Sequence, residues 1–250
     1  MPGAGARIGI VFAGSIGVAL VLMALGGFFS SDEVGTQARV RQALPANEQQ
    51  PGADRDRIAV ITRATALRAT PGGRRLARLT PKTEFKSAKV VPVLDERDGW
   101  LKVIAPELPN GRRGWIDADA AQGGVVDYRL RVDLSGRRLT VLRGDRVVRR
   151  IRTAVGEQGT PTPTGTYGIT DKVPFTDRGS PYGCCALALS AHQPDTPSEW
   201  SGGDRIAIHA TPASESIGRP VTLGCMRVPD RDARWLMRRI PLGTLVSIRA

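Results

Sequence analysis

Residues 128–156 have the sequence YRLRVDLSGRRLTVLRGDRVVRRIRTAVG, and they indicate the structural class more directly than the rest of the chain. Apolar and polar residues alternate from Tyr128 to Leu134, which is typical of a strand with one buried side. Ser135-Gly136 and Gly144-Asp145 then separate this run from two further strand-like runs, as hairpin connections do. We therefore expect a mainly β protein.

Downstream of these strands the sequence predicts one short helix, from Asp230 to Ile240, followed by a last strand at residues 244–248. Asp230 is placed to cap the helix, and Pro241 and Gly243 are expected to end it. Apolar residues at helical spacing give it one buried face: Ala233, Leu236, Met237 and Ile240.

Upstream, residues 57–122 contain short β-type runs separated by turn sequences, which predicts a small barrel. The strings GWLKV at residues 99–103 and GWI at 114–116 resemble the bacterial SH3-like domain. That resemblance implies a module that holds wall peptides or docks a catalytic neighbour, and a plain structural spacer is the alternative. Trp100 and Trp115 are expected in its core.

The N-terminal region contains an uncharged run of apolar residues from Ile8 to Phe29, within an expected anchor at residues 1–29. Such a run is long enough to cross the ~30 Å hydrocarbon core as a helix, and a cleaved secretion signal is the alternative. Arg7 precedes the run and acidic residues follow it, which places the N-terminus in the cytoplasm and the bulk of a single-pass membrane protein outside. Residues 30–56 are polar and are expected to form a flexible linker.

The composition limits the remaining function classes. The formal charge is +12, mostly from arginine, and it reflects either an anionic partner or a general preference for arginine. Nucleic-acid binding is not expected, because the basic residues are interleaved with Asp and Glu rather than gathered with aromatic residues on one face. With two histidines and no Cys-x-x-Cys pair, neither a metal site nor another cofactor is expected.

Two strings carry the chemistry: IAIHATP at residues 206–212 and TLGCMR at 222–227. A thiol is a poor nucleophile while protonated, so a catalytic Cys225 needs an imidazole nearby, and His209 is the better placed of the two histidines. Gly224 can adopt backbone angles closed to other residues. We therefore expect the amides of Gly224 and Cys225 to face the oxyanion that forms on a carbonyl under attack.

These strings, in this order, resemble the L,D-transpeptidase (YkuD-type) catalytic domain, as do TPTPTG at residues 160–165 and PLGTLVSI near the C-terminus. The resemblance covers about half of the chain and implies a β-sandwich catalytic domain at residues 125–250. It also implies that the Ala210 carbonyl orients the His209 ring. Arg227 would bind a carboxylate of the substrate or form a structural salt bridge, and Thr222 keeps the hydroxyl position of the motif at the substrate site.

The implied reaction is transfer of an acyl group from a peptidoglycan stem peptide. Cys225 would attack the carbonyl of the third stem residue, expel the terminal D-alanine and form a thioester. An amine of a second stem would then give a 3→3 cross-link, or water would make the enzyme a carboxypeptidase. Leu223 replaces a second histidine of the family motif. A catalytically weak or inactive wall-binding protein is therefore the alternative.

Three further residues outside these strings could affect the site. His192 is expected at the surface, although it could line the cleft or replace the missing motif histidine in space. Cys184 and Cys185 are expected as small buried residues, with a disulfide to a partner outside the chain as the alternative.

Overall fold

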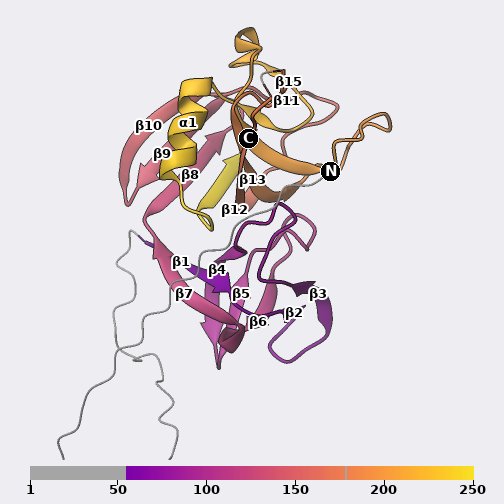
Figure 1. The fold of residues 1–250 in the computed structure, drawn as a ribbon, viewed down its shortest axis with the longest axis vertical. Helices are drawn as coiled ribbons and strands as arrows, with labels where there is room; N and C mark the ends of the chain where they lie inside the picture. Colours follow the sequence, from indigo (N-terminus) through magenta and orange to yellow (C-terminus); the bar gives the residue numbers. More distant parts are fainter. Residues whose placement is uncertain (1–54, 178) are drawn as a thin grey trace, which may run out of the picture. The chain divides into compact units, whose positions relative to one another are not determined.

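The computed structural model describes residues 55–177 and 179–250, and these form two large β-sheets with separate cores and one small two-stranded sheet (Figure 1). The first sheet has seven strands in the order β3-β2-β6-β5-β4-β1-β7. Its elements are β1 (Asp56–Ile61), β2 (Thr65–Arg68), β3 (Arg75–Leu79), β4 (Val90–Arg97), β5 (Trp100–Val103), β6 (Gly114–Asp117), the 3-10 turn η1 (Ala118–Ala120) and β7 (Ala121–Val126). The sheet thus extends to Val126, beyond the expected end of the first block at residue 122.

The second sheet has eight strands in the order β10-β9-β8-β17-β12-β13-β14-β16. Its strands are β8 (Tyr128–Asp133), β9 (Arg138–Arg143), β10 (Arg146–Arg152), β12 (Gly165–Pro174), β13 (Cys185–His192), β14 (Arg205–His209), β16 (Met226–Arg227) and β17 (Leu245–Arg249). The two predicted hairpins are confirmed, because β9 pairs antiparallel with both β8 and β10. Outside this sheet, β11 (Val155–Gly156) pairs with β15 (Pro220–Thr222), and η2 (Ser214–Ser216) precedes β15.

The second sheet forms a β-sandwich around one apolar core, and among the described residues it carries a single α-helix, α1 (Asp230–Arg239). Ala233 and Leu236 of α1 are fully buried in that core. The expected helix is therefore confirmed, but the expected cap is wrong. Pro229 is the residue that precedes the first turn, and the Asp230 carboxylate lies within that turn, where it accepts from the Cys184 amide instead.

The two sheets contact each other through close backbone approaches. A Cβ added at Gly168 of β12 would lie 2.6 Å from Pro92 of β4, so only glycine allows this approach. Beside it, the Arg129 guanidinium donates two hydrogen bonds of 2.7 Å to the Asp56 carboxylate. The β3–β4 connection of the first sheet also contacts the second sheet, where the Thr83 hydroxyl donates to the Asp171 carboxylate of β12.

The predicted membrane anchor and nearly all of the predicted linker lie outside the described residues. Within residues 55–177 and 179–250, no helix has the length and apolar character needed to cross a bilayer.

Candidate active site

His209 is the last residue of β14, and Cys225 immediately precedes β16, the neighbouring strand at one edge of the second sheet. β14 pairs in parallel with β16, so that Ile208 lies opposite Met226 and His209 lies opposite Arg227. Side chains alternate between the two faces of a strand, and this register puts His209 and Arg227 on the same face, with Cys225 two residues before Arg227. In the resting structure the thiol contacts the Arg205 carbonyl oxygen at 3.9 Å and makes no hydrogen bond to the imidazole.

The His209 ring is held in one orientation and in one tautomer. Its Nδ1 lies 2.5 Å from the Ala210 carbonyl oxygen, which can only accept, so Nδ1 carries the proton and Nε2 is free to act as a base. The Tyr182 ring meets it edge-on, with centroids 5.0 Å apart. The pKa of His209 is lowered to about 4, mainly by burial; the Ala210 carbonyl opposes this shift, and the nearby Arg227 charge contributes to it.

Cys225 is also uncharged at rest. Burial raises the pKa of its thiol, and only part of this effect is offset by the backbone of Ala207 and the Arg227 charge. Neither side chain therefore carries a charge at neutral pH.

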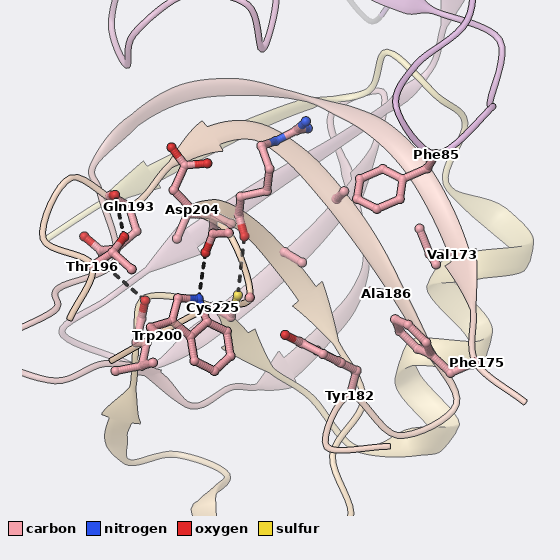
Figure 2. A pocket seen from close by; sticks show the side chains of 17 residues that line it. Phe85, Val173, Phe175, Tyr182, Ala186, Gln193, Thr196, Trp200, Asp204 and Cys225 are labelled. Carbon is pink, nitrogen blue, oxygen red and sulfur yellow. Dashed lines mark hydrogen bonds between the residues drawn. The ribbon is translucent and has the colours of Figure 1, made fainter. Parts of the chain in front are cut away.

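The thiol faces a cavity of about 260 Å³ that is mainly apolar and aromatic (Figure 2). Arg205 and Asp204 supply charged groups on its wall. The apolar lining comes from both sheets: Phe85, Val173, Phe175, Tyr182, Ala186, Ala188, Trp200, Ile206, Ala207 and Leu223. The space suits an extended acyl chain with few charges along it.

The loop before Cys225 is shaped by hydrogen bonds among its own residues. Gly224 has a φ of +105°, and its amide donates to the Thr222 hydroxyl at 3.1 Å. That hydroxyl in turn donates to the Cys225 carbonyl oxygen at 2.6 Å. The Gly224 amide is therefore engaged within the loop, while the Cys225 amide donates to no described residue. Thr222 is 3% exposed and positions the loop rather than facing the cavity.

Residues that were not predicted as part of the site hold the carbonyl oxygens of this loop. Thr160 Oγ1 donates to the Thr222 carbonyl at 3.0 Å, and Thr162 Oγ1 donates to the Gly224 carbonyl at 2.8 Å. Gln193 Nε2 donates to the Leu223 carbonyl at 3.0 Å. The threonine hydroxyls of the TPTPTG string could have indicated the contacts of Thr160 and Thr162. Nothing in the sequence around Gln193 indicated its hydrogen bond to the Leu223 carbonyl.

Residues 127–248 match the model of the YkuD family, the L,D-transpeptidase catalytic domain. Over 124 residues the chain is 36% identical to a protein assigned as L,D-transpeptidase YkuD in Bacillus licheniformis. The aligned segment covers 50% of this chain and 67% of that protein. The chain belongs to the YkuD family. Its members are acyltransferases that act on peptidoglycan stem peptides. The corresponding protein of Bacillus subtilis (strain 168) is 31% identical over 124 residues, with the same coverage.

Two solved L,D-transpeptidases are among the structures that align with part of this chain. One, from Mycobacterium smegmatis, aligns over 57% of this chain and 76% of its own, with a TM-score of 0.40 and 18% identity. Another, from Mycobacterium tuberculosis H37Rv, aligns over 57% of this chain and 67% of its own, with a TM-score of 0.41 and 17% identity.

Arg227, at the Arg/Asn position of the YkuD motif, has no carboxylate partner within the described part of the chain. Its Nε is buried and makes no hydrogen bond there. The expected alternative of a structural salt bridge is therefore absent from the described residues. A cation without a counterion among the described residues, on the same strand face as His209, is suited to bind an anionic group of a ligand.

Leu223 occupies the position of the second histidine in the YkuD motif, and it lines the cavity. His192 does not replace that histidine in space, because its ring lies between the Asp204 carboxylate at 2.9 Å and the Pro106 carbonyl oxygen at 2.7 Å. The neighbouring Gln193 lines the cavity instead. Leu223 thus makes this wall of the site more apolar than a histidine would.

Cys184 and Cys185 lie at the start of β13, on the strand next to β14. Both are free thiols in the structure, and Cys185 is buried as expected. Burial is also the main cause that raises the pKa of each. Among the described residues no group of three or more His, Cys, Asp or Glu side chains could hold a metal ion.

Proposed function

We propose that the protein is a peptidoglycan L,D-transpeptidase with Cys225 as its nucleophile and His209 as its base. The observation that supports this proposal is that His209 ends β14 and Cys225 immediately precedes β16, the strand paired with it, while His209 Nδ1 is bonded to the Ala210 carbonyl. That bond leaves Nε2 as the proton acceptor, and Tyr182, which contacts the His209 ring, lines the same cavity as Cys225.

The first half-reaction cleaves the donor stem. Cys225 sulfur attacks the carbonyl of the third stem residue as its proton moves to His209 Nε2. The Cys225 amide stabilises the oxyanion, and the bond to the terminal D-alanine breaks as the imidazolium returns the proton to the leaving amine. The product is a thioester on Cys225, and a stem carboxylate is held by the Arg227 guanidinium.

The second half-reaction uses an amine of another stem. The amine attacks the thioester carbonyl and gives its proton to His209, the carbon–sulfur bond breaks, and the Cys225 thiol is restored. The result is a 3→3 cross-link, as the family resemblance implies. Hydrolysis by water, which would make the protein an L,D-carboxypeptidase, competes in the same step.

The test is intact-mass spectrometry of the purified protein mixed with a stem tetrapeptide. We expect an adduct equal to the peptide minus its D-alanine, located at Cys225 and absent from Cys225→Ala. His209→Gln should slow the adduct by ~100-fold or more, since general-base catalysis contributes on this scale. A chain that binds the peptide and never forms an adduct would instead be an inactive wall-binding protein, the alternative that Leu223 raised.

We also propose that residues 8–29 anchor the protein in the membrane with the catalytic sheet on the wall side, and that the first sheet is an SH3-like module. The uncharged apolar run and the GWLKV and GWI strings support these assignments. Cell fractionation combined with protease accessibility in spheroplasts tests the anchor, because deletion of residues 1–29 should release the protein from the membrane fraction.

A further inference from the structure

The β3–β4 connection of the first sheet, residues 80–89, has a well-defined conformation. Lys82 pairs with Ala88 in a β-bridge, and the Thr83 amide donates to the Ser87 carbonyl at 3.0 Å. Lys86 adopts a φ of +65° at the turn, and its amide donates to the Thr83 carbonyl at 3.0 Å. This hairpin therefore presents Phe85 in a set direction.

The two residues before Phe85 fasten the hairpin to the second sheet. The Thr83 hydroxyl donates to the buried Asp171 carboxylate of β12, and Glu84 forms an ion pair with Arg205 of β14. Arg205 is itself fixed, because its Nε donates to the Leu189 carbonyl at 3.0 Å. The hairpin is thus attached to the strand that leads directly to His209.

Phe85 lines the same cavity as Cys225, although it comes from the other sheet (Figure 2). It is 47% exposed, and Trp200, which also lines this cavity, is 41% exposed. Large aromatic side chains left open to solvent in a cavity beside a nucleophile are typical of ligand-contacting positions. Figure 2 shows the two rings on opposite sides of the pocket.

We propose that Phe85 is a specificity-determining residue, which holds the peptide chain of the acyl donor across the apolar cavity. This inference rests on the proposed function. We expect the acyl-donor peptide, rather than the acceptor, to occupy the cavity lined by Phe85. Its acyl chain stays attached to Cys225 until the second half-reaction and so remains beside that cavity. The first sheet would then contribute directly to substrate binding.

The experiment compares the full chain with Phe85→Ala, the conservative Phe85→Leu and the control Leu94→Ala. Leu94 lies on β4 of the same sheet, is 42% exposed and lines no part of the cavity. We expect Phe85→Ala to lower kcat/KM for acylation by a tetrapeptide about tenfold, chiefly through KM, since an apolar contact of this size is lost. Phe85→Leu should recover part of the loss, and Leu94→Ala should behave as the parent chain.

Two further measurements separate binding from folding and from catalysis. Alkylation of Cys225 by iodoacetamide should proceed at the same rate in all four proteins, because the reagent is too small to need Phe85. In a Cys225→Ala background, calorimetric titration should show that Phe85→Ala weakens tetrapeptide binding by a similar factor.

The outcomes are distinguishable. If the parent chain forms an adduct and Phe85→Ala matches it in kcat/KM and in binding, the role of Phe85 is wrong. If Phe85→Ala changes alkylation and thermal stability as much as acylation, Phe85 is only structural and the inference is likewise overturned. If the parent chain forms no adduct while Phe85→Ala still weakens binding, the catalytic proposal fails and the peptide contact stands.

Discussion

The Thr162 hydroxyl donates a hydrogen bond of 2.8 Å to the carbonyl oxygen of Gly224, the residue that precedes Cys225. The same hydroxyl accepts a hydrogen bond from the Gly156 amide at 2.9 Å. One buried side chain thus connects β11 to the loop that precedes Cys225. The position of the thiol therefore depends on a string more than sixty residues before it.

Replacing Thr162 by valine should loosen this loop. The substitution keeps the shape of the side chain but leaves the Gly224 carbonyl and the Gly156 amide without their partner, which costs ~1–3 kcal/mol per buried group. We expect chemical denaturation to show a stability loss of about 2 kcal/mol or more, and mass spectrometry to show slower acylation. Thr164→Val, at an exposed position of the same string, is the control and should change neither.

Gly224→Ala should lower the stability of the protein more than an ordinary glycine substitution does. A Cβ at this position would lie 2.4 Å from Gln193 Nε2 and 2.8 Å from Ile206 Cδ1, on a backbone with a φ of +105°. Steric displacement and left-handed strain together should cost roughly 1–3 kcal/mol and misplace the Cys225 amide. Gly159→Ala has open space around it and serves as the comparison. Equal melting temperatures for the two variants would contradict this account.

The pKa of His209 predicts a specific pH dependence of stability. Its folded value of about 4 lies below the ordinary 6.5, so the unfolded chain binds the proton first as the pH falls. The stability present above pH 6.5 is therefore lost progressively toward pH 4, by roughly 3 kcal/mol in total. Urea unfolding should show this loss in the parent chain, whereas His209→Gln should lack that contribution. If the free energy of unfolding falls equally with pH in the parent chain and in His209→Gln, the predicted contribution of His209 is wrong.

Arg227→Met should act both on binding of the proposed substrate and on the titration of His209 and Cys225. Without the guanidinium, a substrate carboxylate loses its partner, and we expect KM to rise about tenfold or more. The Arg227 charge lowers the pKa of both His209 and Cys225, so its removal should raise both values. NMR titration of the His209 ring would follow the upward shift. An unchanged imidazole pKa would mean that the two side chains do not interact.

The sequence predicted most of the local structure in the second sheet, because local patterns determine it. The alternation from Tyr128 onward, the turns at Gly136 and Gly144 and the apolar face of α1 all correspond to observed elements. The nucleophile and base could be proposed from chemistry, since few other residues could perform those roles. The register of β14 and β16 is compatible with that proposal.

The contacts that hold the site together could not be predicted in this way, because they join residues far apart in the sequence. Neither the Gln193 contact to Leu223 nor the Glu84 ion pair with Arg205 has a local signature. Asp230 was misassigned because aspartate is favoured both at the cap and in the first turn of a helix. In the structure Pro229 occupies the cap position, so Asp230 falls in the first turn. Phe85 was overlooked for a similar reason, since its hairpin belongs to the other sheet.

The protonated state of Cys225 has a consequence for its chemical durability. Peroxides and disulfides react with thiolates far more readily than with thiols, so a sulfur whose pKa is raised by burial is attacked slowly. The Cys225 sulfur would thus be slow to form sulfenic acid at neutral pH. Low resting reactivity would make the protein tolerant of an oxidising environment.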